Sequence, residues 1–78
     1  MNRQHYTLTA DAKAKALRIG KRVLKSHSHA EAARLFRYLR GVEWYGPLAL
    51  GSKTHLYLVD DTVSNQQAVN SHGWKYLA

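Results

Sequence analysis

Four basic residues recur at helical spacing near the N-terminus and predict a surface that binds anions. The segment AKAKALRIGKRVLKSH, residues 12–27, holds six Lys or Arg residues and no acidic one. If it is helical, Lys15, Arg18, Arg22 and Lys25 fall on one narrow stripe, because successive members are three or four positions apart. Because acidic partners at that spacing are almost absent, the charges repel one another, which favours a phosphate-bearing or acidic partner.

A second set of basic residues follows in RLFRYLR, where the arginines stand three positions apart. Arginine presents a planar fork that suits phosphate oxygens, and an exposed tyrosine between arginines can stack on a base. We therefore expect a nucleic-acid or partner-binding surface. Its expected members are Lys15, Arg18, Lys21, Arg22, Lys25, Arg34, Arg37, Tyr38 and Arg40.

These predicted helices lack the features of a motif that reads DNA bases. KRVLKSHSHAEAARLFRYLR has the order helix, link, helix, but the link has no glycine and no Asn or Gln lies early in its second half to read adenine. We expect contacts to the phosphates of DNA or RNA that depend little on base sequence. The remaining large aromatic residues are expected mainly in core and sheet packing. They are Trp44, Tyr45, Tyr57 and Trp74.

Other chemistry finds less support in the sequence. There are five histidines and no cysteine, and no spacing typical of a zinc site occurs. His55 or His72 with Asp60 or Asp61 would permit hydrolysis, but no motif points to it. We expect no metal, no cofactor and no enzymatic activity.

The first predicted helix spans residues 10–25 and follows a short predicted strand at residues 5–9. Ala12, Ile19 and Val23 fall together on its apolar side, opposite the basic stripe. Leu17 widens this apolar side. We expect the basic stripe to be exposed and Ala12, Ile19 and Val23 to be buried behind it.

The second predicted helix spans residues 29–40. It opens on a capping box made of Ser28 and Glu31, and Gly41 is expected to end it in a left-handed conformation. The short SHS link predicts that the two helices form a hairpin or a corner.

After residue 41 the hydrophobic period changes from helical to alternating. PLALGSKTHLYLV predicts two strands around a GSK turn, with Leu56 and Leu58 on one face and Tyr57 and Val59 on the other. Residues 61–70 fit either a short capped helix or a polar strand, and WKYLA fits a terminal strand. The chain is thus predicted to be one α+β domain over residues 1–78, a two-helix hairpin packed on a small, mostly antiparallel sheet.

Charge is unevenly distributed along the 78 residues. Residues 1–40 hold ten Lys or Arg against two acidic residues, whereas residues 41–78 hold two against three. The absence of cysteine fits a reducing compartment, and no apolar run approaches a signal peptide or a membrane span. We expect a cytoplasmic protein with a positive face and no membrane association.

Two broad functions remain open. The first is a small basic binding module that docks on nucleic-acid backbone. The second is an adaptor or inhibitor, of the kind encoded by phages and mobile elements, that docks on an acidic surface of a larger protein or nucleoprotein complex. A homodimer is an open alternative in either case, because a domain of this size buries a modest core.

A more remote alternative comes from a family resemblance. YTLTADAKAKALRIGKRVLKSHSHAEAARLFRYL resembles the opening strand and helical hairpin of ParE/RelE-type toxins, and HLYLVDDTVSNQQAV followed by SHG is similar to their closing hairpin. The resemblance implies a toxin with a basic set on its sheet. This chain departs from that pattern, since only Lys53, His55, His72 and Lys75 are available.

Overall fold

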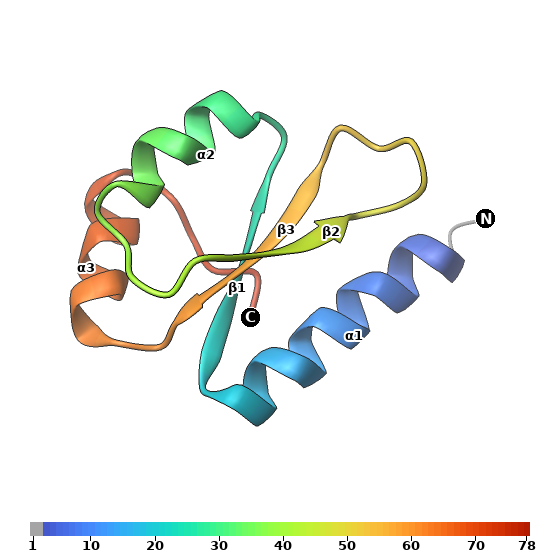
Figure 1. Cartoon of the computed structure of the whole chain (residues 1–78), viewed down its shortest axis with the longest axis horizontal. Helices are drawn as coiled ribbons and strands as arrows, with labels where there is room; N and C mark the ends of the chain where they lie inside the picture. The colour runs from blue at the N-terminus through green and yellow to red at the C-terminus, as the bar shows by residue number, and fades with distance from the viewer. Residues whose placement is uncertain (1–2) are drawn as a thin grey trace.

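Residues 3–78 fold into three helices and one three-stranded sheet. A computed structural model describes the backbone of residues 3–78 and the side chains of residues 9–78. The elements are α1 (Arg3–Ile19), β1 (Lys21–Ser26), α2 (His29–Phe36), β2 (Glu43–Pro47), β3 (His55–Asp60) and α3 (Val63–Ser71). The strands are antiparallel in the order β1-β3-β2, which confirms the predicted α+β class (Figure 1).

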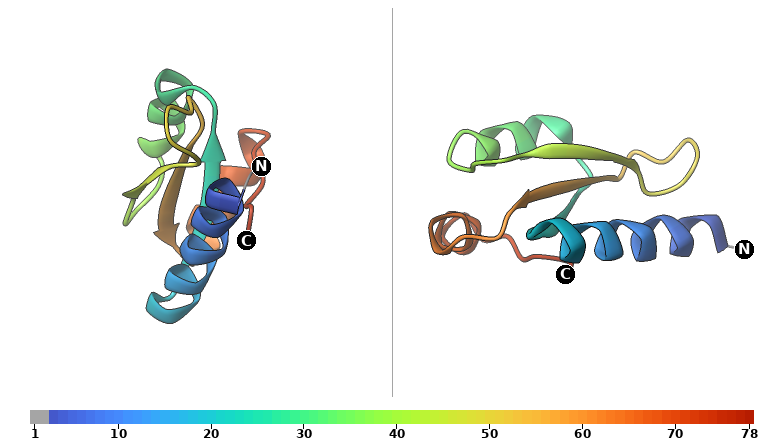
Figure 2. Two further views of the ribbon diagram at one scale, coloured as in Figure 1. Left: turned by 90° about the vertical axis from the view of Figure 1, so that its right-hand side faces the viewer. Right: turned by 60° about the horizontal axis from the view of Figure 1, so that its bottom comes forward.

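Helices cover both faces of the sheet. α1 and α2 lie on opposite sides of it (Figure 2). The core under α1 contains Ala12 and Ala16 with Leu56 and Leu58 of β3. The core on the other face joins α2 and α3 to the remaining inward side chains of β1 and β3. Its buried members are Leu24, Ala32, Leu35, Leu39, Tyr57, Val59 and Val69. The alternation predicted for β3 is therefore confirmed, and both of its faces are buried.

The first helix ends earlier than predicted. Gly20 takes a left-handed conformation with φ 72°, and the next six residues form β1. Val23 and Leu24 are adjacent in sequence and both fully buried, on opposite faces of the sheet. A strand covered on both faces has no polar side, so its residues also fit a helical period.

Two further predictions are corrected at this end of the chain. The segment 5–9, predicted as a strand, lies within α1. The predicted two-helix hairpin does not form, because β1 intervenes between α1 and α2 and enters the sheet beside β3. The two helices therefore do not share one positive face.

The predicted start of α2 is confirmed, whereas its end is not. Ser28 is the N-cap, and its hydroxyl accepts a hydrogen bond from the Glu31 N–H at 3.3 Å. The helix ends at Phe36 because the following turn tightens to hydrogen bonds that span three residues, such as that from the Tyr38 N–H to the Leu35 carbonyl at 2.9 Å. Residues 37–40 are thus a turn and not helix.

Gly41 adopts the predicted left-handed conformation, with φ 69°. It does not end the helix directly, since the turn lies between them. A Cβ atom at this position would overlap the Asp60 carboxylate, which is the movable end of a side chain, so the left-handed backbone conformation is the main reason for glycine here.

The segment 61–70, which fitted either a helix or a strand, belongs mostly to helix α3. Thr62 caps α3 by accepting a hydrogen bond from the Asn65 N–H at 3.1 Å. Residues 74–78 are not a regular strand, but Leu77 and Ala78 exchange two backbone hydrogen bonds with Val23 at 2.7 and 3.1 Å. The final segment therefore covers part of the outer edge of β1.

Candidate binding surfaces

The predicted basic stripe is divided between two elements and partly neutralised. Lys15, on α1, forms an ion pair with Glu43 of β2 at 2.9 Å, and its ammonium lies 5.9 Å from the centre of the Tyr45 ring. The hydrogen bond from Lys15 lowers the pKa of Glu43. Arg18 is exposed on α1 and Lys25 is exposed on β1. The prediction of one exposed stripe on one helix is wrong, because the chain turns at Gly20.

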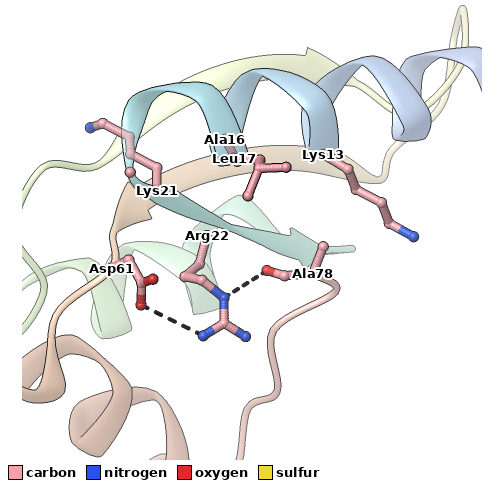
Figure 3. A pocket seen from close by; sticks show the side chains of 8 residues that line it. Lys13, Ala16, Leu17, Lys21, Arg22, Asp61 and Ala78 are labelled. Atoms are coloured by element: carbon pink, nitrogen blue, oxygen red, sulfur yellow. Dashed lines mark hydrogen bonds and ion pairs between the residues drawn. The ribbon is translucent and has the colours of Figure 1, made fainter.

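Lys21 and Arg22 hold the end of β1 in place. The Lys21 ammonium lies 3.3 Å from the Asp60 carboxylate and also donates to the Gly41 carbonyl. The Arg22 guanidinium donates to the Ala78 carbonyl at 3.0 Å and lies 3.7 Å from Asp61, as Figure 3 shows. The side chains of Lys21 and Arg22 are therefore engaged within the fold.

Arg22 also covers an aromatic ring. Its guanidinium carbon lies 4.2 Å from the centre of the Tyr76 ring, a cation–π distance. The Tyr76 hydroxyl is buried without a hydrogen-bond partner among the described residues. Burial raises the pKa of Tyr76, with Arg22 acting in the opposite direction. This contact adds to the structural role of Arg22.

Most basic side chains remain unpaired after these contacts are made. Of the eleven Lys and Arg residues in positions 9–78, three form ion pairs, with Glu43, Asp60 and Asp61. Eight basic residues remain, against two carboxylates, those of Asp11 and Glu31. The unpaired basic residues, all exposed, are Lys13, Arg18, Lys25, Arg34, Arg37, Arg40, Lys53 and Lys75.

One group of unpaired residues lies on the outer side of α2 and the turn after it. Arg34, Arg37 and Arg40 are exposed, and Tyr38 is 59% exposed. The Tyr38 ring packs against His72, just after α3, with ring centres 4.9 Å apart. We call these four residues, Arg34, Arg37, Tyr38 and Arg40, the arginine surface. All four were predicted as binding residues, and the fold keeps them together.

The turn that carries Arg40 is fixed from beneath by a buried amide. Asn65, on α3, is fully buried, and its side-chain oxygen accepts the Arg40 N–H at 3.0 Å. Its amide group donates to the carbonyls of Arg40 and Asp60, each at 2.9 Å. Asn65 therefore joins the arginine surface to the end of β3, a role that the sequence pattern did not indicate.

A groove of about 430 Å³ lies between α1 and the end of β1, and Figure 3 shows its lining. Lys13 and Leu17 line it from α1, and Lys21 and Arg22 from β1. Ile19 is 43% exposed, so its predicted burial is wrong, and Leu17, which widens the predicted apolar side, is 86% exposed. The groove combines an apolar side chain with cations on both sides.

A pocket of about 310 Å³ lies on the α2 side of the sheet and is lined by aromatic rings. His29, Trp44, His55 and Tyr57 line it, from α2, β2 and β3. Tyr57 is buried, as expected, but Trp44 is 58% exposed, contrary to its expected role in packing. β2 is an edge strand, and this position, which the sequence pattern does not reveal, leaves the indole uncovered. We call these four residues the aromatic pocket.

The residues weighed for other chemistry do not come together. Within residues 9–78 no group of three or more His, Cys, Asp or Glu side chains is placed to hold a metal ion. His55 contacts Trp44, whereas His72 contacts Tyr38. No described helix is long and apolar enough to cross a membrane.

Comparison with known proteins adds no assignment. No family model, no curated protein and no solved structure matches the chain. The strand followed by a helical hairpin, on which the resemblance to ParE/RelE-type toxins depended, is replaced by α1, β1 and α2. Function is therefore inferred from the side chains of the surfaces described above.

Proposed function

We propose that this is a small, non-enzymatic nucleic-acid-binding protein whose arginine surface contacts the phosphate backbone of DNA or RNA. The observation that carries the proposal is the excess of eight unpaired basic residues over two unpaired carboxylates in residues 9–78. Three of the eight are arginines from seven consecutive positions of one helix and its turn. Such clustering produces a local positive potential that attracts a polyanion.

The side chains favour phosphate contacts over base reading. Arg34 and Arg37 are three residues apart in helical geometry and so lie on neighbouring positions of one side. α2 contains no Asn or Gln that would pair with adenine. Binding should therefore depend strongly on salt and weakly on base sequence.

Salt dependence of binding tests this proposal quantitatively. Each neutralised phosphate contributes about −0.9 to the log–log slope on duplex DNA and about −0.7 on a single strand. Three arginine contacts give slopes of about −2.7 and −2.1. The double variant Arg34→Ala/Arg37→Ala should flatten the slope by about two-thirds and weaken binding to unrelated sequences alike. Anisotropy titration of labelled duplex and single strands at several salt concentrations measures both quantities.

The matched control removes the same charge from the opposite side of the sheet. Lys13→Ala/Arg18→Ala, on α1, deletes two exposed and unpaired cations. If the arginine surface is the contact, this control changes the slope far less than the α2 variant does. An equal effect of both variants would mean that net charge and not this surface drives binding. Absence of binding to either strand below about 100 μM at low salt would refute the proposal.

The groove beside α1 supports a second candidate function, docking on an acidic protein surface. Leu17 is 86% exposed and is flanked in the groove by Lys13 and Lys21. Lys21 is paired with Asp60, and Asp61 also lines the groove, so among the described residues Lys13 is the lining cation that is free to meet a partner. An apolar anchor beside an unpaired cation suits an acidic protein partner, such as the target of an adaptor or inhibitor. Pull-down from a nuclease-treated lysate tests this function. A protein captured by the native chain but not by Leu17→Ser would support it, whereas capture that is lost on nuclease treatment would count against it.

A further inference from the structure

We propose that the aromatic pocket receives a base of single-stranded nucleic acid while the arginine surface holds the neighbouring phosphates. This inference rests on the proposed function, because it names the form of nucleic acid that the same side of the molecule binds. The pocket is formed by rings from three elements, and one of its exposed rings is an indole, the largest stacking surface among the side chains.

Trp44 is held in place although it is exposed. Its indole N–H donates to Nδ1 of His55 at 3.1 Å, and the two ring centres lie 6.0 Å apart. The opposite wall is fixed in a similar way, since Nδ1 of His29 lies 3.1 Å from the Tyr57 hydroxyl. Tyr57 is itself packed edge-on against Phe36, with ring centres 4.7 Å apart. The pocket therefore does not depend on a ligand to order its rings, which reduces the entropic cost of stacking.

The hydrogen bond also defines a polar group that a base can use. An indole N–H only donates, so Nδ1 of His55 must accept, and neutral His55 carries its proton on Nε2. That N–H has no partner among the described residues. It is a suitable donor for a carbonyl oxygen of thymine, uracil, cytosine or guanine. Stacking tolerates any base, and this single donor adds a modest preference.

The pocket and the arginine surface lie on the same side of the sheet and share one helix. His29 opens α2 beside the pocket, and Arg34 follows five residues later, about 7.5 Å along the helix axis. Five residues also turn the helix by about 140°, so Arg34 lies round the helix from His29. A single strand with one base in the pocket must therefore follow α2 for its next phosphates to meet the long Arg34 side chain. A duplex keeps its bases stacked inside and offers none to the pocket. Positive charge around an aromatic pocket favours a nucleic-acid strand over an uncharged, proline-rich peptide, the other ligand that aromatic grooves bind.

Trp44 itself reports on the pocket. The chain has two tryptophans, so the variant Trp74→Phe leaves Trp44 as the sole indole. In this background we compare an oligothymidylate of about eight nucleotides with an abasic strand of equal length and charge. Stacking should quench Trp44 fluorescence and make the oligothymidylate bind about 5- to 150-fold more tightly than the abasic strand. The same affinity ratio, measured by anisotropy, should persist in the chain that retains Trp74.

Two further variants decide where the preference arises. Trp44→Ala should reduce the affinity for oligothymidylate to that for the abasic strand, and Arg34→Ala/Arg37→Ala should weaken both. Because Trp44 is mostly exposed, its removal should leave the urea unfolding midpoint nearly unchanged, which checks that the fold is intact.

The possible failures are distinguishable. Equal affinity for the two strands, or a preference that survives Trp44→Ala, overturns the base-pocket proposal but leaves phosphate binding in place. Failure of both strands to bind overturns phosphate binding as well. Quenching of Trp44 by a proline-rich peptide and not by oligothymidylate would assign the pocket to a peptide.

Discussion

Replacing Asn65 by alanine should destabilise the domain more than replacing any one of its exposed basic residues. The side chain is fully buried and makes three hydrogen bonds of 2.9 to 3.0 Å. Two of its partners would still accept a hydrogen bond after the substitution. The Arg40 carbonyl accepts one from the Asp60 N–H, and the Asp60 carbonyl accepts one from the Thr62 N–H. The Arg40 N–H has no other partner among the described residues.

The expected cost follows from these contacts. Leaving the Arg40 N–H unpaired costs about 1–3 kcal/mol, and each of the two lost amide hydrogen bonds contributes about 0.5–1.5 kcal/mol. The sum predicts that Asn65→Ala lowers the free energy of unfolding by about 2–6 kcal/mol. A domain of this length has a total stability of about 4–12 kcal/mol, so the change is large. Urea unfolding followed by circular dichroism measures it.

A charged variant sharpens the test. Asn65→Asp keeps the acceptor for Arg40 but places carboxylate oxygen against two carbonyls. Desolvation and this repulsion should raise the pKa of the new carboxyl in the folded state. A raised pKa means that stability is highest below the ordinary carboxyl value of about 4 and is lost as pH rises through the folded value. The variant should therefore be more stable at low pH relative to Asn65→Ala than it is at pH 7.

The control is the exposed neighbour Gln66, whose replacement by alanine should change stability by less than about 0.5 kcal/mol. A loss below about 1 kcal/mol for Asn65→Ala would refute the reasoning. It would mean that the turn after α2 is not held by this amide and that Arg40 is positioned by other contacts.

Three other predictions follow from single contacts. Ser28→Ala removes the cap that accepts the Glu31 N–H and should cost about 0.5–2 kcal/mol in urea unfolding, with Ser28→Thr close to the native value. Tyr76→Phe removes a buried hydroxyl without a partner, so stability at pH 7 should be unchanged or higher by up to about 1 kcal/mol; a larger loss would reveal a partner. Burial raises the pKa of Tyr76, so the native chain should lose stability above about pH 10, and the phenylalanine variant should lose less. The lowered pKa of Glu43 stabilises the fold above the ordinary carboxyl range, and this contribution disappears as pH falls through the folded value. Lys15→Met should therefore make unfolding less dependent on pH in acid, and an unchanged pH profile would contradict the ion pair.

The sequence predicts those parts of the fold where a local signal and the tertiary structure agree. Alternation along residues 56–59 correctly separates the two faces of β3, and the spacing of Ser28 and Glu31 correctly marks the start of α2. Both features are governed by neighbouring residues. The hydroxyl caps its own helix, and side chains of a strand alternate whatever the strand pairs with.

The prediction of secondary structure failed where one hydrophobic pattern fits both a helix and a strand. Residues 21–26 continue the helical spacing of the preceding segment, yet they form an edge strand whose Val23 and Leu24 are buried on opposite faces of the sheet. Gly20 was the available signal, because glycine is the residue that most readily takes the left-handed conformation that ends a helix. Continuous apolar spacing on both sides of it favoured the wrong alternative.

The binding surfaces were only partly predictable for a related reason. Arg34 stays exposed because α2 buries Ala32 and Leu35 on its other side, and Arg37 and Tyr38 stay exposed on the turn that follows. The aromatic pocket depends on which strand lies at the sheet edge. No local pattern records that position, and so the exposure of Trp44 appeared only in the structure.

The uneven charge of the sequence has two physical origins that the fold separates. All three acidic residues of the second half, Glu43, Asp60 and Asp61, pair with basic residues of the first half. These pairs join α1 and β1 to β2 and to the end of β3. Three basic residues of the first half are therefore explained by ion pairs within the fold. No such explanation covers Arg34, Arg37 and Arg40, on α2 and the turn after it, which face solvent without an ion pair among the described residues. Like charges so close together repel one another at a cost in stability. Our proposal assigns this clustering to a ligand of opposite charge.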